Sequence, residues 1–416
     1  MVMTTLAHNI DVGFLHEAYR RTRKDGAVGV DGQTAEEYAA NLWENLRSLL
    51  NRFKSGTYRA PSIRRVHIAK VDGKETRPIG IPTFEDKVLQ RAVAMVLEAV
   101  YEQDFLDCSY GFRPGRSAHQ ALEVLWKGQM EMGGGVVIDL DIQAFFDSLD
   151  RRHLRNILDQ RVQDGVLRRQ IDKWLKAGVL EKGTLRYPET GTPQGGVISP
   201  LLANIYLHEV LDRWFEDCVK PRLEGWAFLV RFADDAVLVF SSSSDARRVR
   251  EVLVKRFAKY GLTIHPEKTR VIDFRRPGPQ QRCGGNGFDF LGFTHYWGRS
   301  RQGRWVVKRK TTPKRLTRAI KVIATWCKAH RHWPIEVQQQ TLARKLRGHC
   351  AYYGITGNAE SLGRFRHEMA RTWQKWLNRR SQKKSMRWDR FRRLLKRYPL
   401  PSARAIHSVY RQAASP

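Results

Sequence analysis

The stretch FLVRFADDAVLVF, residues 228–240, places two adjacent aspartates between two apolar runs. Both runs are rich in branched and aromatic residues, which favour β-strands. Because aspartate tolerates turn conformations, the stretch predicts a β-hairpin with an acidic turn at Asp234 and Asp235. Taken alone, the stretch is better explained by a solvated acidic turn, so the rest of the chain must decide whether these carboxylates have a function.

A second acidic strand end precedes this hairpin in VVIDLDIQAFFDSLD, residues 136–150. Asp141 closes the predicted strand, and Asp139, two residues earlier, shares its face. If these strands meet, three carboxylates about 4 Å apart would repel one another by several kcal/mol. A divalent cation removes that penalty, and oxygen donors without a nearby His or Cys favour Mg²⁺. Two such ions, about 4 Å apart, suit phosphoryl transfer.

A glycine-rich segment, ETGTPQGGVISPLLANIYLHEVLD, lies between the two acidic stretches. Ser199 and Pro200 predict the start of a helix, with Ser199 as the N-cap. Gln194 offers both a donor and an acceptor, and the segment lacks the Gly-Lys-Ser/Thr of a Walker loop. Three glycines would let the backbone approach a ligand closely: Gly191, Gly195 and Gly196. A plain glycine-rich turn before a helix is the alternative interpretation.

The charge of the chain is unusual and unevenly distributed. The 416 residues contain 74 lysines and arginines against 42 acids, a net charge of +32. Residues 301–416 hold 30 of these bases and only 4 acids. Segregated positive charge indicates a nucleic-acid partner. A basic membrane-surface protein is disfavoured because no apolar run approaches 18 residues.

Further composition and local patterns outline the organisation. Five cysteines without a CxxC pair argue against a zinc module or a disulfide framework, and the start of the chain lacks the pattern of a secretory signal, so a cytoplasmic location is expected. The chain is long enough for several domains. Local patterns predict helices on both sides of a glycine-rich bend at 24–34, a hairpin at 61–82, a helix at 85–105, a glycine joint at 133–135, a loop at 275–287 and basic helices beyond Pro313.

Taken in order, these segments resemble the group II intron reverse transcriptase/maturase family, over nearly the whole chain. The matching blocks are RPIGIPTFEDKVLQRAV, SYGFRPGRSAHQAL, DLDIQAFFDSLD, GTPQGGVISPLLANIYLHEVLD, RFADD, GLTIHPEKT, FDFLGF, LRGHCAYYGITGN, and WLNRRSQ through PLP. The resemblance implies an α/β (α+β) right-hand polymerase. Its expected parts are an N-terminal extension and the start of the fingers (1–60), helical fingers (61–135), an antiparallel-sheet palm (136–300) and a basic helical thumb, or maturase region (301–416).

The family's roles carry over by position. Asp141, Asp234 and Asp235 would be the catalytic carboxylates that hold two Mg²⁺ ions, or Mn²⁺ as a substitute, with the Ile142 carbonyl as a further ligand. The residues implied to bind the nucleotide are Lys70 and Arg77 at the triphosphate, Phe146 against a 2′-hydroxyl, Gln194, and Lys268 as a proton donor to pyrophosphate. Those implied to bind nucleic acid are Arg113, Arg116, Gly292 in the primer grip, Arg379, Arg380, Lys383 and Lys384.

Several alternatives to these roles stay open. Lys74 replaces Lys70 if the hairpin register differs, Phe145 and Phe146 could both belong to the core, and Lys268 could be a surface lysine. Asp139 is a possible helper of Asp141. Phe232 stands where the family usually has tyrosine, which removes one hydroxyl hydrogen bond worth roughly 1 kcal/mol while keeping the ring.

The resemblance implies an RNA-directed DNA polymerase that binds group II intron RNA or another structured RNA template, assists splicing, and copies the intron into DNA from a DNA primer or target with dNTPs during retrohoming. No HNH-type His/Asn cluster is present, so cleavage of a second target strand is not expected. Two alternatives are a splicing-only maturase and a related polymerase domesticated for DNA repair or phage defence. Intact Asp141, Asp234 and Asp235 argue against the first of these.

Overall fold

The computed structural model describes residues 1–69, 76–181, 184–187, 195–278, 280–281, 286–380 and 386–407. Contacts divide the chain into two compact units. Unit 1 comprises Met1–Ala121 and Val136–Val271, and unit 2 comprises Leu122–Gly135 and Ile272–Pro416. These units are defined by contacts and do not test the division into fingers, palm and thumb, which stays a prediction.

Unit 1 begins with helices on both sides of a glycine-rich bend, as the sequence predicts, and their buried residues belong to one core. They are the 3-10 helix η1 (Ala7–Asn9) and the α-helices α1 (Val12–Arg21), α2 (Ala35–Ala40) and α3 (Leu42–Ser55). Thr34 and Glu37 form a reciprocal capping box that starts α2. Gly56 ends α3 in the left-handed conformation with φ 78°, which glycine adopts without steric cost.

The predicted hairpin forms part of a larger sheet. Strands β1 (Ile63–Ala69) and β2 (Thr76–Ile81) pair antiparallel, as expected, but β1 also pairs in parallel with β4 (Val179–Glu181), which pairs with β5 (Thr184–Arg186). The helix that follows, α4 (Phe84–Tyr101), starts at the cap Thr83 and buries apolar residues at the predicted 3–4 spacing.

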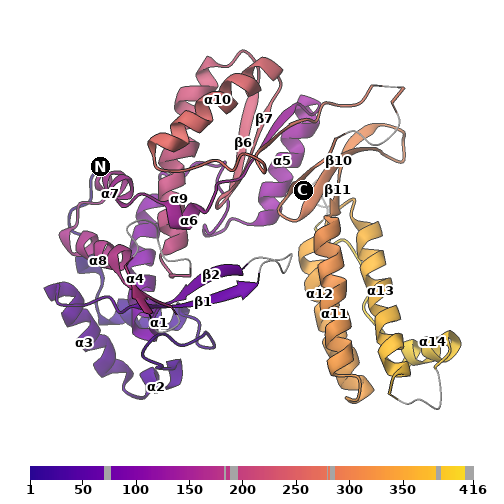
Figure 1. Cartoon of the computed structure of the whole chain (residues 1–416), viewed down its shortest axis with the longest axis horizontal. Coiled ribbons are helices and arrows are strands. Elements are labelled where there is room, and N and C mark those ends of the chain that lie inside the picture. The colour runs from indigo at the N-terminus through magenta and orange to yellow at the C-terminus, as the bar shows by residue number, and fades with distance from the viewer. Residues whose placement is uncertain are drawn as a thin grey trace, which may run out of the picture. The chain divides into compact units, whose positions relative to one another are not determined.

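A second sheet carries the two acidic stretches. Its strand order is β6-β7-β3-β8, with bounds β3 (Val136–Leu140), β6 (Ala227–Phe232), β7 (Asp235–Phe240) and β8 (Arg270–Asp273). β7 pairs antiparallel with both β3 and β6, and its residues after Asp235 are buried. The remaining helices of this unit are α6 (Phe145–Ser148), α7 (Arg151–Asp159), α8 (Gly165–Lys176), α9 (Ser199–Leu207) and α10 (Ser243–Lys259), which Figure 1 shows around the sheets.

The start of α9 differs from the prediction by one residue. Ile198 is the N-cap and Ser199 is already the first helical residue, with no side-chain hydrogen bond capping the helix. Ile198 and Ser199 are both buried. Beyond α9, the chain continues into a π-helix, η2 (His208–Val219), and a 3-10 helix, η3 (Lys220–Arg222).

Unit 2 combines a small sheet with basic helices. The sheet has the order β11-β10-β9, with bounds β9 (Phe288–Phe290), β10 (Phe293–Arg299) and β11 (Trp305–Thr311). Helix α5 (Ala118–Met132) contributes Trp126, whose indole N–H donates to the Val307 carbonyl at 2.8 Å. As predicted, the chain is helical from Pro313, in α11 (Pro313–Ala329), α12 (Ile335–Tyr353), α13 (Ala359–Asn378) and α14 (Trp388–Arg397). Trp373 is fully buried among these helices.

The lengths and hydropathies of the helices bear on membrane insertion. Among the helices of the described ranges, none combines the length and the apolar character needed to cross a bilayer.

Candidate active site

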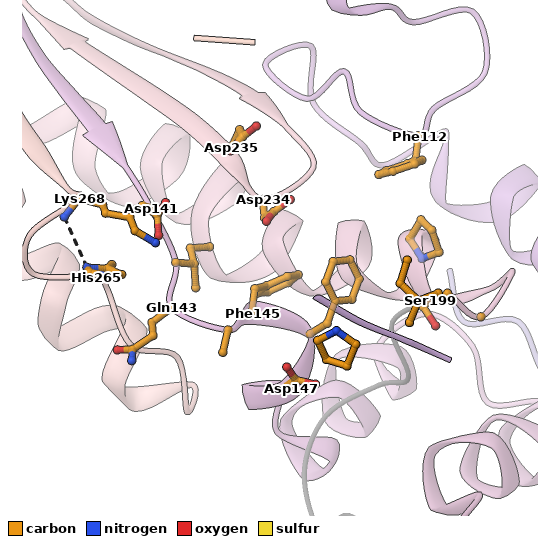
Figure 2. A pocket seen from close by; sticks show the side chains of 18 of the residues that line it. Phe112, Asp141, Gln143, Phe145, Asp147, Ser199, Asp234, Asp235, His265 and Lys268 are labelled. Carbon is orange, nitrogen blue, oxygen red and sulfur yellow. Dashed lines mark hydrogen bonds between the residues drawn. The ribbon is translucent and has the colours of Figure 1, made fainter. Parts of the chain in front are cut away.

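A cavity of about 680 Å³ in unit 1 brings together most of the motif blocks described above. Its wall comes from β2, the end of β3, α6, the start of α9, the β6–β7 turn and the loop before β8 (Figure 2). The lining residues are Thr76, Pro78, Ile79, Phe112, Asp141, Ile142, Gln143, Ala144, Phe145, Phe146, Asp147, Gly195, Gly196, Ser199, Pro200, Asp234, Asp235, His265 and Lys268.

Asp141 reaches the cavity because the strand that carries it is fixed on both sides. The last β3–β7 pair is Leu140 with Ala236, so Asp141 follows directly beside the start of β7. The backbone N–H of Asp141 donates to the Thr269 hydroxyl at 3.2 Å, and its carbonyl accepts the His265 N–H at 2.8 Å. Hydrogen bonds within the protein therefore hold the backbone of Asp141 in place.

The hairpin turn is tight, as predicted, but Asp235 lies in the strand that follows it. Asp235 is the first residue of β7 and pairs with Phe232, so only Ala233 and Asp234 form the turn. Two-residue hairpin turns need positive φ, and Ala233 has φ 57°. Asp234 and Asp235 both line the cavity, and Figure 2 shows the two side chains at its edge.

These carboxylates are not preassembled into a metal cluster. Within the described ranges, no group of three or more His, Cys, Asp or Glu residues is arranged to hold a metal ion. The donor chemistry nevertheless fits a hard divalent cation, because Asp141, Asp234 and Ile142 offer only oxygen atoms to the cavity. Asp139, the possible helper, does not line the cavity and forms an ion pair with Arg270 at 2.9 Å.

Two adjacent aromatic residues, Phe145 and Phe146, line the cavity together with Asp141. Phe145 is only 3% exposed and belongs to the core, whereas Phe146 is partly buried and packs against that core. Their rings meet edge to face, with centroids 5.3 Å apart. Ala144, just before them, has a left-handed φ of 45°. The more accessible ring at the cavity is therefore Phe146, the residue implied to sense the 2′-hydroxyl.

Lys268 lines the cavity, as its implied role requires. Its backbone N–H donates to the Nδ1 atom of His265 at 3.4 Å, the dashed line in Figure 2. His265 and Phe112 also line the cavity, although neither was singled out from the sequence. Both lie inside quoted blocks, GLTIHPEKT and SYGFRPGRSAHQAL, which is the signal that could have identified them.

Several predicted nucleotide-binding residues fall outside the described ranges. They are Lys70, its alternative Lys74, and Gln194. Arg77 lies in β2, of which Thr76, Pro78 and Ile79 line the cavity, although its side chain is outside the described part. Gly195, with φ 109°, passes so close to β2 that an added Cβ would lie 2.4 Å from the Gly80 carbonyl oxygen.

Buried polar side chains form hydrogen bonds with the loop that contains Gly195 and Gly196. The Gln90 side-chain oxygen accepts the Val197 N–H at 2.7 Å, and its amide donates to Asp86 at 2.8 Å. Asp86 also accepts hydrogen bonds from the Tyr58 hydroxyl and the Trp174 indole. Burial raises the pKa of Asp86 to about 6 in spite of these three donors.

The prediction that Arg113 binds nucleic acid is wrong. Its side chain is 3% exposed and forms an ion pair with Glu102 at 2.9 Å. The remaining N–H groups donate to the carbonyls of Phe105, Leu106 and Ser109. Because burial and these partners occupy the whole guanidinium, no donor is left for a phosphate.

The other predicted nucleic-acid contacts stay predictions. Arg116 is 30% exposed and pairs with Asp107. In unit 2, Gly292 has φ 81°, Arg379 lies 5.1 Å from the centre of the Trp376 ring, and Arg380 donates to the carbonyls of Arg331 and Trp333. Lys383 and Lys384 lie outside the described ranges.

Comparisons with known proteins agree with this arrangement. The family model described as reverse transcriptase (RNA-dependent DNA polymerase) matches residues 68–295, which include every residue that lines the cavity. The group II intron-encoded protein LtrA of Lactococcus lactis subsp. cremoris is 42% identical over 183 residues, 44% of this chain and 30% of that protein. The protein YkfC of Escherichia coli (strain K12) is 33% identical over 311 residues, 66% of this chain and 77% of that protein.

A plant relative extends the comparison to a protein named as a maturase. The mitochondrial nuclear intron maturase 2 of Arabidopsis thaliana is 28% identical over 235 residues, 47% of this chain and 30% of that protein. The chain thus spans less than a third of the length of the Lactococcus and Arabidopsis proteins. From the extent of the family match, and in agreement with the resemblance of its motif blocks to group II intron proteins, the chain belongs to the reverse transcriptase (RNA-dependent DNA polymerase) family.

Proposed function

We propose that the chain is an RNA-directed DNA polymerase that extends a DNA primer with dNTPs on a structured RNA template. The observation that carries this proposal is the meeting of Asp141, Asp234, Phe146 and Lys268 around one cavity. The template we propose is group II intron RNA, whose splicing the protein assists and which it copies into DNA during retrohoming, working in the cytoplasm. The names of the relatives and the +32 charge support this choice.

In the proposed reaction, the primer 3′-oxygen attacks the α-phosphorus of a dNTP, and pyrophosphate leaves. Asp141, Asp234 and Asp235, with the Ile142 carbonyl, would hold two Mg²⁺ ions, or Mn²⁺ in their place. Bound there, the ions would activate the attacking oxygen and neutralise charge on the leaving one. The Phe146 ring closes the floor beneath the sugar and crowds a 2′-hydroxyl. Lys268 would give a proton to the departing pyrophosphate, and Lys70, Arg77 and Gln194 would orient the nucleotide.

The experiment that tests the proposal is Asp234→Asn, which keeps the size of the side chain and removes one charge. Primer extension on an RNA template should fall by a factor of at least about 100, because charge stabilisation at the reacting phosphate is lost. RNA binding and any splicing activity should persist, since most of the net positive charge, +26 of +32, lies in residues 301–416.

The matched control is Asp139→Asn, in the same sheet but outside the cavity. It should retain near-normal extension. Full extension by the Asp234 variant would refute the assignment of the cavity as the polymerase site. Loss of extension, RNA binding and splicing together in a folded Asp234 variant would refute the separation of chemistry from binding.

A further inference from the structure

An arginine in the hairpin strand is buried completely beside the catalytic turn. Arg231, in β6, has no exposed surface, and neither has its partner Asp212. The two side chains form a paired contact, with Nε to Oδ1 at 2.7 Å and Nη2 to Oδ2 at 2.5 Å. Such a fork joins both carboxylate oxygens to one edge of the planar guanidinium and so fixes its orientation.

The remaining donors of Arg231 reach three other parts of unit 1. Nη1 donates to the Asn204 side-chain oxygen in α9 and to the Ala233 carbonyl in the turn, both at 2.9 Å. Nη2 donates to the Ser109 hydroxyl at 2.8 Å. All five N–H groups therefore have an acceptor, and one of those acceptors belongs to the turn that presents Asp234.

The turn is also held from its other side. The segment around Ser109 runs beside β6, with the Arg231 N–H donating to the Cys108 carbonyl at 2.7 Å. Gly111 then passes so close to the turn that an added Cβ would lie 2.3 Å from the Ala233 nitrogen. Asn204 fixes this approach by donating from its amide to the Gly111 carbonyl at 2.7 Å.

Burying this ion pair costs free energy, which indicates a role besides stability. Removing two charges from water carries a large desolvation penalty, and apolar replacements of a buried ion pair are often as stable as the pair itself. The left-handed φ of Ala233 is a second cost, because a Cβ is disfavoured in that conformation. Both costs involve residues just before Asp234, namely Arg231 of the ion pair and Ala233 of the turn.

We propose that Arg231 is a positioning residue for the polymerase reaction. Through its bond to the Ala233 carbonyl it holds the left-handed turn, so that the Asp234 carboxylate faces the cavity, and Asp212 and Asn204 fix the guanidinium in that orientation. The inference rests on the proposed polymerase function. It predicts that loss of Arg231 changes metal use and turnover more than substrate binding.

The test compares the double variant Arg231→Met/Asp212→Leu with the wild type. Its thermal unfolding midpoint should stay within about 4 °C, since both charges leave together. The kcat for primer extension should fall at least tenfold and the half-saturating Mg²⁺ concentration should rise, while the KM for dNTP and RNA binding change little. The matched control, Arg161→Met/Asp104→Leu, removes another two-bond pair in the same unit and should keep kcat and the Mg²⁺ response.

A second variant keeps the test decisive if the double variant does not fold. Arg231→Lys retains the charge but loses the fork, and should show the same loss of kcat. Adding Ala233→Gly should restore part of it, because glycine adopts the left-handed conformation without help. A folded Arg231 variant with normal kcat and Mg²⁺ response, or a loss that Ala233→Gly does not relieve, would overturn the proposal. An inactive wild type would refute the polymerase function instead.

Discussion

Substitution of the buried Asp86 by asparagine should change how stability depends on pH. Asp86 lies in α4, 1% exposed, and anchors the loop before α9 through Gln90. Burial raises its pKa from the ordinary value of 3.8 to about 6, because the charged form loses its hydration. Asparagine has nearly the same shape and does not titrate, so Asp86→Asn isolates the effect of this one proton.

The sign follows from the raised pKa. Between about pH 4 and pH 6, folded Asp86 keeps its proton while the unfolded chain has lost it, so the folded state is favoured at the lower pH. This stabilisation is complete below the unfolded pKa and is lost as the pH rises through the folded one. Two pKa units at 1.36 kcal/mol each give a total change of about 3 kcal/mol.

Scanning calorimetry of both proteins from pH 4 to pH 7 measures the effect, since titrations shared by the two proteins cancel in the difference. For a unit of this size, 3 kcal/mol corresponds to roughly 6–12 °C. As the pH rises from 4 to 7, the unfolding midpoint of the variant relative to that of the wild type should therefore increase by about 6–12 °C. A constant difference introduced by the amide does not affect this change.

The control is Asp107→Asn, which makes the same substitution at a carboxylate that is 90% exposed. A constant difference between Asp86→Asn and wild type would refute the reasoning. It would mean that the hydrogen bonds from Tyr58, Trp174 and Gln90 offset the burial of the charge completely.

Three further outcomes follow from the site and the basic helices. Phe146→Ala should reduce the preference for dNTPs over rNTPs by on the order of 10- to 100-fold, measured as the ratio of kcat/KM values; an unchanged ratio would place the gate elsewhere. Charge reversal of Arg379 and Arg380 should flatten the salt dependence of RNA binding by roughly one in log–log slope for each phosphate that is no longer neutralised, and an unchanged slope would leave them as solvated charges. Gly111→Ala should lower extension at least tenfold and destabilise the fold by about 1–3 kcal/mol, because its Cβ would overlap the turn, whereas Gly363→Ala, with open space around it, should be neutral or mildly stabilising.

The parts of the fold that depend on local patterns could be predicted from the sequence. The hairpin of β1 and β2, the apolar stripe of α4 and the helices beyond Pro313 each follow from residues close together in the chain. The pairing of β1 with β4 could not be predicted, because it joins residues more than 100 positions apart and the three residues of β4 carry little signal of their own.

The candidate site shows the same limit on a finer scale. Motif order predicts that Asp141, Asp234 and Asp235 lie close together, and all three line one cavity. It does not predict that Asp235 belongs to strand β7 and not to the turn, since that depends on the turn having only two residues. Nor does it predict that Arg113 forms an ion pair with Glu102, because that pair depends on the path of the chain after α4.

Backbone strain connects these observations. Among the described residues, four besides glycine have positive φ, and two of them, Phe112 and Ala144, line the cavity while a third, Ala233, immediately precedes Asp234. Such conformations persist only where surrounding contacts over-determine them. For Ala233 those contacts come from Arg231 and Gly111, which approach the turn from different segments. The RFADD motif identifies the carboxylates, but in the proposed role of Arg231 the direction of Asp234 depends on buried neighbours that do not reach the cavity, so substitutions of those neighbours should alter catalysis without touching substrate.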